Sequence, residues 1–249
     1  MSRRHPFRPL AQAVGERFPD LADPVAEIAS GRVTVNGLVV TNPRALVRRD
    51  ATIAMPAPAP LRGEVKLQAA LDAFSTDVSG RVALDLGAAA SGFTRALLRR
   101  GARRVYAVDA GHGQLLGSLR QEGRVVNLER TNLSELTQQL VPDAVDVLTA
   151  DLSYIALATA LPQLNGVAFR RGAELIALVK PMFELARGQP PDRSADWLRA
   201  VALASAGAQA AGWRVAGSMR SPVTGASGAV EFFVHGRRLA TGGENARVG

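Results

Sequence analysis

The sequence predicts an α/β protein, built as a doubly wound and mostly parallel β-sheet that follows a small α+β unit. Three observations carry this prediction. From residue 61 onward, short apolar runs typical of buried strands alternate with helical stretches, as in a parallel sheet covered by helices. Before residue 55, the pair Asn36-Gly37 lies between β-branched runs and indicates a hairpin. Between the two halves lies Pro56-Ala57-Pro58-Ala59-Pro60, which can continue neither a helix nor a ladder.

The N-terminal unit is expected to span residues 1–55 and to hold two helices and three short strands. Helices are expected around residues 9–17 and 24–30, followed by the hairpin and a third strand at 51–55. A unit of this size has a marginal core, so we expect its stability to depend on a neighbouring domain or on a ligand. Residues 56–62 are interpreted as a semi-rigid, proline-rich linker.

The larger predicted domain covers residues 63–236 and is followed by a flexible tail at 237–249. Strands are expected at 82–86, 105–109, 124–128, 145–150 and 175–179, and helices at 64–74, 93–100 and 193–211. The last two strands, 213–221 and 229–235, are joined by a glycine-containing turn. This hairpin adds one antiparallel strand to the sheet.

The composition excludes several classes of protein. Apolar residues make up 47% of the 249 residues, which is enough for a proper core and argues against a disordered chain. Cysteine is absent, so disulfides, zinc–cysteine clusters and cysteine nucleophiles are excluded. No apolar run reaches the length of a membrane span, and the N-terminus lacks the apolar stretch of a signal peptide. A cytoplasmic protein is expected.

The charge balance points to a polyanionic partner. Thirty basic residues face 22 acidic ones, a net charge of +8, which favours nucleic acid over a membrane. Of the thirty, 28 are arginine and only Lys66 and Lys180 are lysine. Two positions have thus kept an ammonium in a chain that otherwise uses arginine.

The segment after the first strand of the larger domain has the features of a ligand-binding loop. It reads Asp85-Leu86-Gly87-Ala88-Ala89-Ala90-Ser91-Gly92-Phe93, with small residues that let a ligand approach backbone N–H groups at a helix start. Phe93 stands where a Walker A loop needs lysine, so a nucleotide triphosphate loop is excluded. Asp109 ends the next strand, where a carboxylate typically accepts hydrogen bonds from ribose. The alternative is a tight turn without a ligand.

Four further charged residues are candidates for a reaction site. Asp151 and Lys180 each follow one of two adjacent predicted strands, so we expect them within several Å of each other over the ligand crevice. Alternatively, Asp151 caps a helix and Lys180 only ends a strand. Glu231 lies in the last strand, where the alternative is an edge-strand charge that opposes aggregation. Lys66 lies in a helix, and a lone helical lysine is usually solvated.

Several of these segments together resemble a known family. The most specific are Asp85-Leu86-Gly87-Ala88, residues 105–115, Glu129-Arg130-Thr131-Asn132, residues 178–184 and Ser221-Pro222-Val223-Thr224-Gly225. In this order they resemble the TlyA-like ribosomal RNA 2′-O-methyltransferases, over about residues 7–235. The second half resembles the FtsJ-type methyltransferases.

The resemblance implies an S4-like RNA-binding domain joined to a class I, Rossmann-like methyltransferase domain that uses S-adenosylmethionine. It implies ribosomal RNA or ribosomal subunits as the partner, and no metal. The implied catalytic set is Lys66, Asp151, Lys180 and Glu231. Cofactor contacts are expected from Asp85, Gly87, Ala88, Ser91, Gly92, Phe93, Asp109, Ala110, Asn132 and Asp151, and RNA contacts from Arg32, Asn36, Arg48, Arg49 and Arg62.

The chemistry that follows is methyl transfer to a ribose hydroxyl. A 2′-hydroxyl is a poor nucleophile and must be aligned and partly deprotonated. Our hypothesis is that Lys180 orients and deprotonates this hydroxyl, while Asp151 fixes the Lys180 ammonium and faces the methyl donor. Lys66 and Glu231 are expected to position the nucleotide.

Two other functions stay open at this stage. One is an RNA-associated protein of the same fold that binds the cofactor and methylates poorly, an alternative motivated by Glu64 and by Ala90-Ser91 in the loop. The other is a small-molecule O-methyltransferase, motivated by the weakly basic first domain. The net charge and the complete set of four residues favour the RNA enzyme over both.

Overall fold

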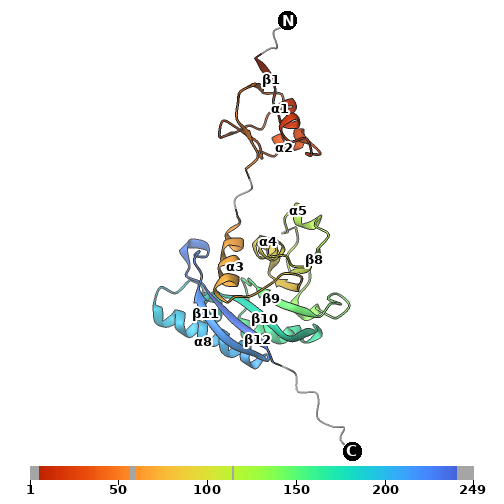
Figure 1. Ribbon diagram of the computed structural model, residues 1–249. Coiled ribbons are helices and arrows are strands. Elements are labelled where there is room, and N and C mark those ends of the chain that lie inside the picture. The colour runs from red at the N-terminus through yellow and green to blue at the C-terminus, as the bar shows by residue number, and fades with distance from the viewer. Residues whose placement is uncertain (1–5, 57–59, 114, 240–249) are drawn as a thin grey trace, which may run out of the picture. The chain divides into compact units, whose positions relative to one another are not determined.

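The computed structural model describes residues 6–56, 60–113 and 115–239 (Figure 1). The chain divides into two compact units, residues 1–59 and 60–249. This division falls inside the predicted linker at 56–62. Most of the predicted tail, residues 240–249, lies outside the described residues.

The N-terminal unit packs two helices against short strands. Its elements are β1 (Phe7–Pro9), α1 (Leu10–Arg17), α2 (Pro24–Ala29), β2 (Thr34–Val35), β3 (Leu38–Val39), β4 (Leu46–Arg48) and β5 (Ile53–Ala54). Asn36 and Gly37 have φ of 50° and 83°, as the hairpin between β2 and β3 requires. Strand β5 pairs with β2 on the side away from β3, and β1 pairs with β4 in a second small sheet that was not predicted. Leu10, Val14 and Ile28 are fully buried in the core of this unit.

The second unit contains seven strands with helices on both faces. Its strands are β6 (Val82–Leu86), β7 (Arg104–Asp109), β8 (Val125–Glu129), β9 (Val145–Ala150), β10 (Phe169–Val179), β11 (Trp213–Arg220) and β12 (Phe232–Arg238). Its α-helices are α3 (Arg62–Ala73), α4 (Gly92–Arg99), α5 (Gly117–Arg120), α6 (Leu157–Ala160), α7 (Pro181–Glu184) and α8 (Ser194–Ala210). Its 3₁₀ helices are η1 (Ala88–Ala90), η2 (Leu133–Glu135), η3 (Leu161–Gly166) and η4 (Ala226–Gly228).

The strands lie in the order β11-β12-β10-β9-β6-β7-β8. Strand β12 is antiparallel to both of its neighbours, and the pairings from β10 to β8 are parallel. The predicted antiparallel strand is therefore present, inserted between β10 and β11. Strand β10 begins six residues before the predicted start at Leu175, with an irregular register between Phe169 and Glu174.

Each face of the sheet has its own apolar core. On one face, Leu67 and Leu71 of α3 and Leu97 of α4 pack over Ala83 of β6. On the other, the alanines of α8 pack in the same cluster as Val82, Leu84 and Leu86. Successive side chains of a strand point to opposite faces of the sheet, so Ala83 belongs to one core and its neighbours Val82 and Leu84 belong to the other. Within the described residues, no helix combines the length and the apolar character needed to cross a membrane.

Candidate active site

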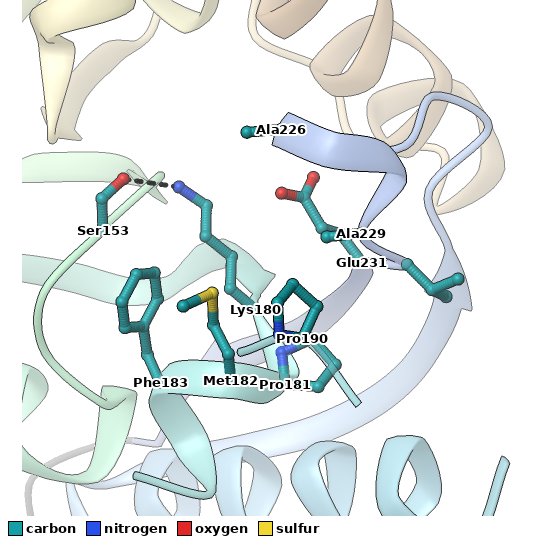
Figure 2. A pocket seen from close by; sticks show the side chains of 10 residues that line it. Ser153, Lys180, Pro181, Met182, Phe183, Pro190, Ala226, Ala229 and Glu231 are labelled. Carbon is teal, nitrogen blue, oxygen red and sulfur yellow. Dashed lines mark hydrogen bonds between the residues drawn. The ribbon is translucent and has the colours of Figure 1, made fainter. Parts of the chain in front are cut away.

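The first group of polar residues lies beyond the carboxyl ends of the neighbouring strands β9 and β10. The Lys180 Nζ lies 2.6 Å from Asp151 Oδ1. It also donates a hydrogen bond of 2.7 Å to Ser153 Oγ (Figure 2). The side chains of Lys180 and Asp151 are only 16% and 15% exposed. Parallel strands end at the same edge of a sheet, and this brings together two residues that are 29 positions apart.

The second group joins the start of α3 to the segment before β12. Lys66 Nζ and Glu231 Oε2 form an ion pair at 2.5 Å, with side chains 8% and 5% exposed. Lys66 is therefore not the solvated helical lysine of the alternative interpretation. Glu231 does not lie at a sheet edge either, because β12 runs between β10 and β11.

Both groups border one cavity of about 230 Å³. Figure 2 shows the Lys180 amine and the Glu231 carboxylate pointing into it from different elements. The rest of the wall is mostly apolar and comes from Pro181, Met182, Phe183, Pro190, Ala226, Ala229 and Val230, with Ser153 beside Lys180. The cavity thus combines charged groups with apolar surface, as expected of a site for a small ligand or one nucleotide.

A second feature beside the loop that follows β6 is a narrow cavity that is too tight in this structure to admit a water molecule. It is lined by Gly63, Asp85, Gly87, Ala88, Ser91, Gly92, Phe93 and Asp151. Gly87 has φ of +81°, and a Cβ there would lie 2.4 Å from the carbonyl oxygen of Asp151. The turn therefore requires glycine at this position, and it holds the loop directly against the segment that carries Asp151.

Asp85 is fully buried at the end of β6. Its carboxylate accepts hydrogen bonds from Thr94 of α4 at 2.7 Å and from Thr149 of β9 at 2.8 Å. Burial chiefly, with a smaller contribution from the nearby Asp151, raises the pKa of Asp85 to about 7, against the opposing effect of the two threonine hydrogen bonds. Asp85 thus ties α4 to β9, and its carboxyl titrates near neutral pH.

Asp109 ends β7 and faces the same loop. Its carboxylate accepts hydrogen bonds from the backbone N–H groups of Ala89 at 3.1 Å and Gly111 at 2.7 Å. Ser91 Oγ accepts a hydrogen bond of 2.9 Å from the Leu116 backbone. The predicted contact residues around this loop are therefore held by one another and by backbone groups.

The comparison with known proteins identifies the family. Residues 60–238 match the sequence profile of the FtsJ-like methyltransferases. The chain belongs to the FtsJ-like methyltransferase family. It is an enzyme, and its cofactor is S-adenosylmethionine.

Individual relatives of this FtsJ-like methyltransferase extend over most of the chain. It is 42% identical to the 16S/23S rRNA (cytidine-2′-O)-methyltransferase TlyA of Mycobacterium tuberculosis, over 83% of this chain and 80% of that protein. It is 32% identical to Hemolysin A of Brachyspira hyodysenteriae, over 84% and 90% of the two chains. A solved structure from Streptococcus thermophilus that carries a hemolysin label covers 95% of this chain and 90% of its own, with a TM-score of 0.69 and 27% identity.

The residues around the narrow cavity suit S-adenosylmethionine by their chemistry. The cofactor carries a sulfonium, an ammonium, a carboxylate and ribose hydroxyls. The carboxylates of Asp109 and Asp151 suit the cationic and hydroxyl groups, and the first N–H groups of α4 suit the carboxylate. The amide of the predicted contact Asn132 lies 3.2 Å from Glu135 of its own turn, and Ala110 immediately follows Asp109. Their contacts with the cofactor stay predictions.

The predicted RNA-binding residues of the N-terminal unit make contacts inside that unit. Arg32 pairs with Glu27, and Arg48 pairs with Asp50. Asn36 Oδ1 accepts a hydrogen bond of 2.9 Å from the Thr52 backbone. Arg49 is exposed. Contact with RNA stays a prediction for all of them.

The sequence did not predict the contacts that four side chains make in the site of this FtsJ-like methyltransferase. Ser153 binds Lys180, Thr94 and Thr149 bind Asp85, and Arg62 binds backbone carbonyls in a distant segment. The only available signal was position: Ser153 lies two residues beyond Asp151 at the end of a strand. Across the described residues, no group of three or more His, Cys, Asp or Glu side chains could hold a metal ion.

Proposed function

We propose that this FtsJ-like methyltransferase methylates a ribose 2′-oxygen of ribosomal RNA. One observation carries the proposal: Lys180, held by Asp151 and Ser153, lines the larger cavity, which we propose receives the target nucleotide. The same Asp151 lines the narrow cavity at the loop. The group that activates the hydroxyl and the group that faces the cofactor are therefore in direct contact.

S-adenosylmethionine supplies a methyl group on a positively charged sulfur. The loop from Gly87 to Phe93 would hold the cofactor, with Asp109 at its ribose and Asp151 beside its charged end. The turn at Gly87 keeps this loop against the segment carrying Asp151, and Asp151 in turn lies 2.6 Å from the Lys180 amine. Alignment of this kind supplies much of the rate of group transfer.

Lys180 is proposed to orient the hydroxyl and take its proton. A lysine ammonium has three N–H donors: Ser153 accepts one, and Asp151 lies 2.6 Å away as the ion-pair partner. The unprotonated amine of Lys180 would accept the hydroxyl proton, and bound S-adenosylmethionine would supply the methyl group that the oxygen takes up. Asp151 then stabilises the resulting ammonium. Lys66 and Glu231 are proposed to hold the far side of the nucleotide.

Ribosomal RNA is the proposed substrate for two reasons. The chain carries a net charge of +8, which favours a polyanion. Its relative from Mycobacterium tuberculosis is named for 2′-O-methylation of cytidine in 16S and 23S rRNA. We propose that cytidine is the target nucleotide of this chain as well. We also propose that the N-terminal unit is an S4-like RNA-binding domain and that ribosomal subunits in the cytoplasm are the partner.

Transfer of a labelled methyl group tests this function. The full chain is incubated with labelled S-adenosylmethionine and with total RNA, isolated small subunits or isolated large subunits, and the label is mapped. Label on a cytidine 2′-oxygen of rRNA is the expected result. Cofactor binding without label would favour an RNA-associated binding protein. Label only in small molecules would favour a small-molecule O-methyltransferase.

A further inference from the structure

Arg62 makes two contacts that join distant parts of the second unit, residues 60–249, which we call the catalytic unit. It is the first residue of α3 and precedes Lys66 by one helical turn. Its guanidinium Nη2 donates hydrogen bonds to the carbonyl oxygens of Thr224 at 2.6 Å and of Gly225 at 3.1 Å. The helix that carries Lys66 is thereby fastened to the segment that leads to Glu231.

Gly225 lies directly against the carboxylate of Glu231. A Cβ at this glycine would lie 2.2 Å from Glu231 Oε1, so the close approach requires that the side chain be absent. The backbone N–H of Gly225 donates to the carbonyl of Ala229 at 2.7 Å, and the N–H of Ser221 donates to the carbonyl of Glu231 at 2.9 Å. These bonds fold residues 221–231 into a compact segment that we name the 221–231 loop.

The 221–231 loop also forms one wall of the larger cavity. Ala226, Ala229 and Val230 line that cavity together with Glu231, and Figure 2 shows Ala226 and Ala229 beside the glutamate. The loop has two side-chain attachments to α3, namely Arg62 to its carbonyls and Lys66 to its carboxylate. If the first attachment is lost, both the cavity wall and the carboxylate lose a fixed position relative to α3.

We propose that Arg62 is a positioning residue for methyl transfer, which rests on the proposed function of this site. Arg62 holds the 221–231 loop against α3, and this keeps Glu231 on Lys66 and shapes the wall that receives the target nucleotide. Arg62 lies at the surface, and its guanidinium donates to backbone carbonyls of this same chain. This role differs from a phosphate contact, which would bring RNA to the enzyme and leave the transfer step unchanged.

The two roles predict different effects of Arg62→Met, which keeps the length of the side chain and removes its donors. For a positioning residue, we expect kcat to fall about 10- to 100-fold while KM for RNA stays within about twofold. The slope of log affinity against log salt concentration should not change. If Arg62 instead contacted an RNA phosphate, kcat would be unchanged and the magnitude of this slope would decrease by about one. That result would overturn the proposal.

Arg103→Met is the matched control, because Arg103 is exposed and the substitution removes the same charge. It should leave kcat unchanged. Arg62→Lys keeps a donor of similar reach and should recover part of the lost kcat. An equal loss of kcat in the Arg103 variant would overturn the assignment to Arg62.

Hydrogen exchange in the full chain gives a readout that does not depend on activity. In Arg62→Met, amides of the 221–231 loop should exchange faster than in the wild type, while those of β9 and β10 stay protected. Unchanged exchange in the loop would overturn the proposal even if activity fell. If the wild type methylates no RNA but the loop still loosens in the variant, the proposed function fails and the positioning contact stands.

Gly225→Ala tests the same contact from the other side. The added methyl group should displace Glu231, lower kcat and leave the salt slope unchanged. Full activity in a folded Gly225→Ala variant would show that the position of Glu231 does not matter, and would overturn the proposal.

Discussion

Lys66 and Glu231 form a buried ion pair across 165 residues of sequence. The two charged atoms lie 2.5 Å apart, and neither side chain is more than 8% exposed. Removing two charges from water is unfavourable, and their mutual attraction compensates this only while both partners are present. The pair therefore couples the stability of the fold to the geometry of the site.

Substitution of either partner of this pair should destabilise the catalytic unit. Lys66→Met and Glu231→Gln each leave the other group buried without its partner, and we expect each to cost about 3–5 kcal/mol. The double variant should cost clearly less than the sum of the two. Urea unfolding followed by tryptophan fluorescence measures this, since Trp197 and Trp213 both lie in the catalytic unit. Additive effects would show that the two groups do not interact.

Much of the fold follows from local sequence pattern. Strand β6 lies where predicted, because a run that is apolar except for Asp85 ends at a glycine that turns the chain. The start of β10 was not predicted, because residues 170–174 are mostly polar or glycine and do not look like a buried strand. The pairing of β1 with β4 joins two strands of only three residues, which carry no detectable period.

The candidate site was predictable where topology alone brings residues together. Asp151 and Lys180 follow two parallel strands, so their proximity could be inferred from strand order. The partners Thr94, Thr149 and Ser153 could not, because hydroxyl side chains at strand and helix ends are common and most bind backbone or water. The contact from Arg62 to Thr224 spans 162 residues and depends on the path of a loop that has no repeating pattern.

Lys180 should be required for transfer and dispensable for cofactor binding. Lys180→Ala removes the proposed base, and we expect the rate of methyl transfer to fall by about 10²- to 10⁴-fold. Lys180→Arg should be nearly as inactive, since an arginine stays protonated. Calorimetric titration with S-adenosylmethionine should show near-normal affinity in both variants. Near-normal turnover in Lys180→Ala would contradict the assignment of the base.

Glu64 should stabilise the contact between α3 and α4. Glu64 is fully buried and pairs with Arg95 at 3.2 Å and with Arg99 at 2.6 Å. The negative charge of Glu64 at the start of α3 is therefore compensated by two arginines of α4. Glu64→Gln leaves two arginines without a partner. Because Arg99 reaches solvent, we expect a loss on the order of 2 kcal/mol rather than the full value for a buried pair.

Asp72→Asn is the matched control for Glu64→Gln in urea unfolding. Asp72 pairs with Arg100 at 2.5 Å, between α3 and the residue that ends α4, but its side chain is 63% exposed. Surface pairs contribute little, so a loss below about 1 kcal/mol is expected. Equal losses in the two variants would mean that burial of Glu64 does not decide its contribution.

Asp85 should make the stability of the catalytic unit fall as pH rises from about 4 to 7. Its carboxyl has a pKa near 7 in the folded protein, raised chiefly by burial from the ordinary value of 3.8. Between these values the folded state binds more protons than the unfolded state, so the free energy of unfolding decreases with increasing pH. Glu174 stays ionised in the folded protein across this window, but its unfolded-state carboxyl titrates near 4.5, so it opposes this trend only at the acidic end of the window. Burial opposes its ionisation, but hydrogen bonds from His235, Thr76 and Arg81 hold its pKa at about 2.

Asp85→Asn removes this titration and can keep a hydrogen bond to each threonine, because its amide both donates and accepts. We expect the variant to match the wild type near pH 4 and to exceed it progressively up to pH 7, by up to about 4 kcal/mol. Urea unfolding of both cofactor-free proteins across this range measures the difference, in which all shared titrating groups cancel. A difference independent of pH would show that Asp85 is already ionised in the folded protein at pH 4. The threonine hydrogen bonds would then outweigh burial, and the proton assigned to this site at neutral pH would be absent.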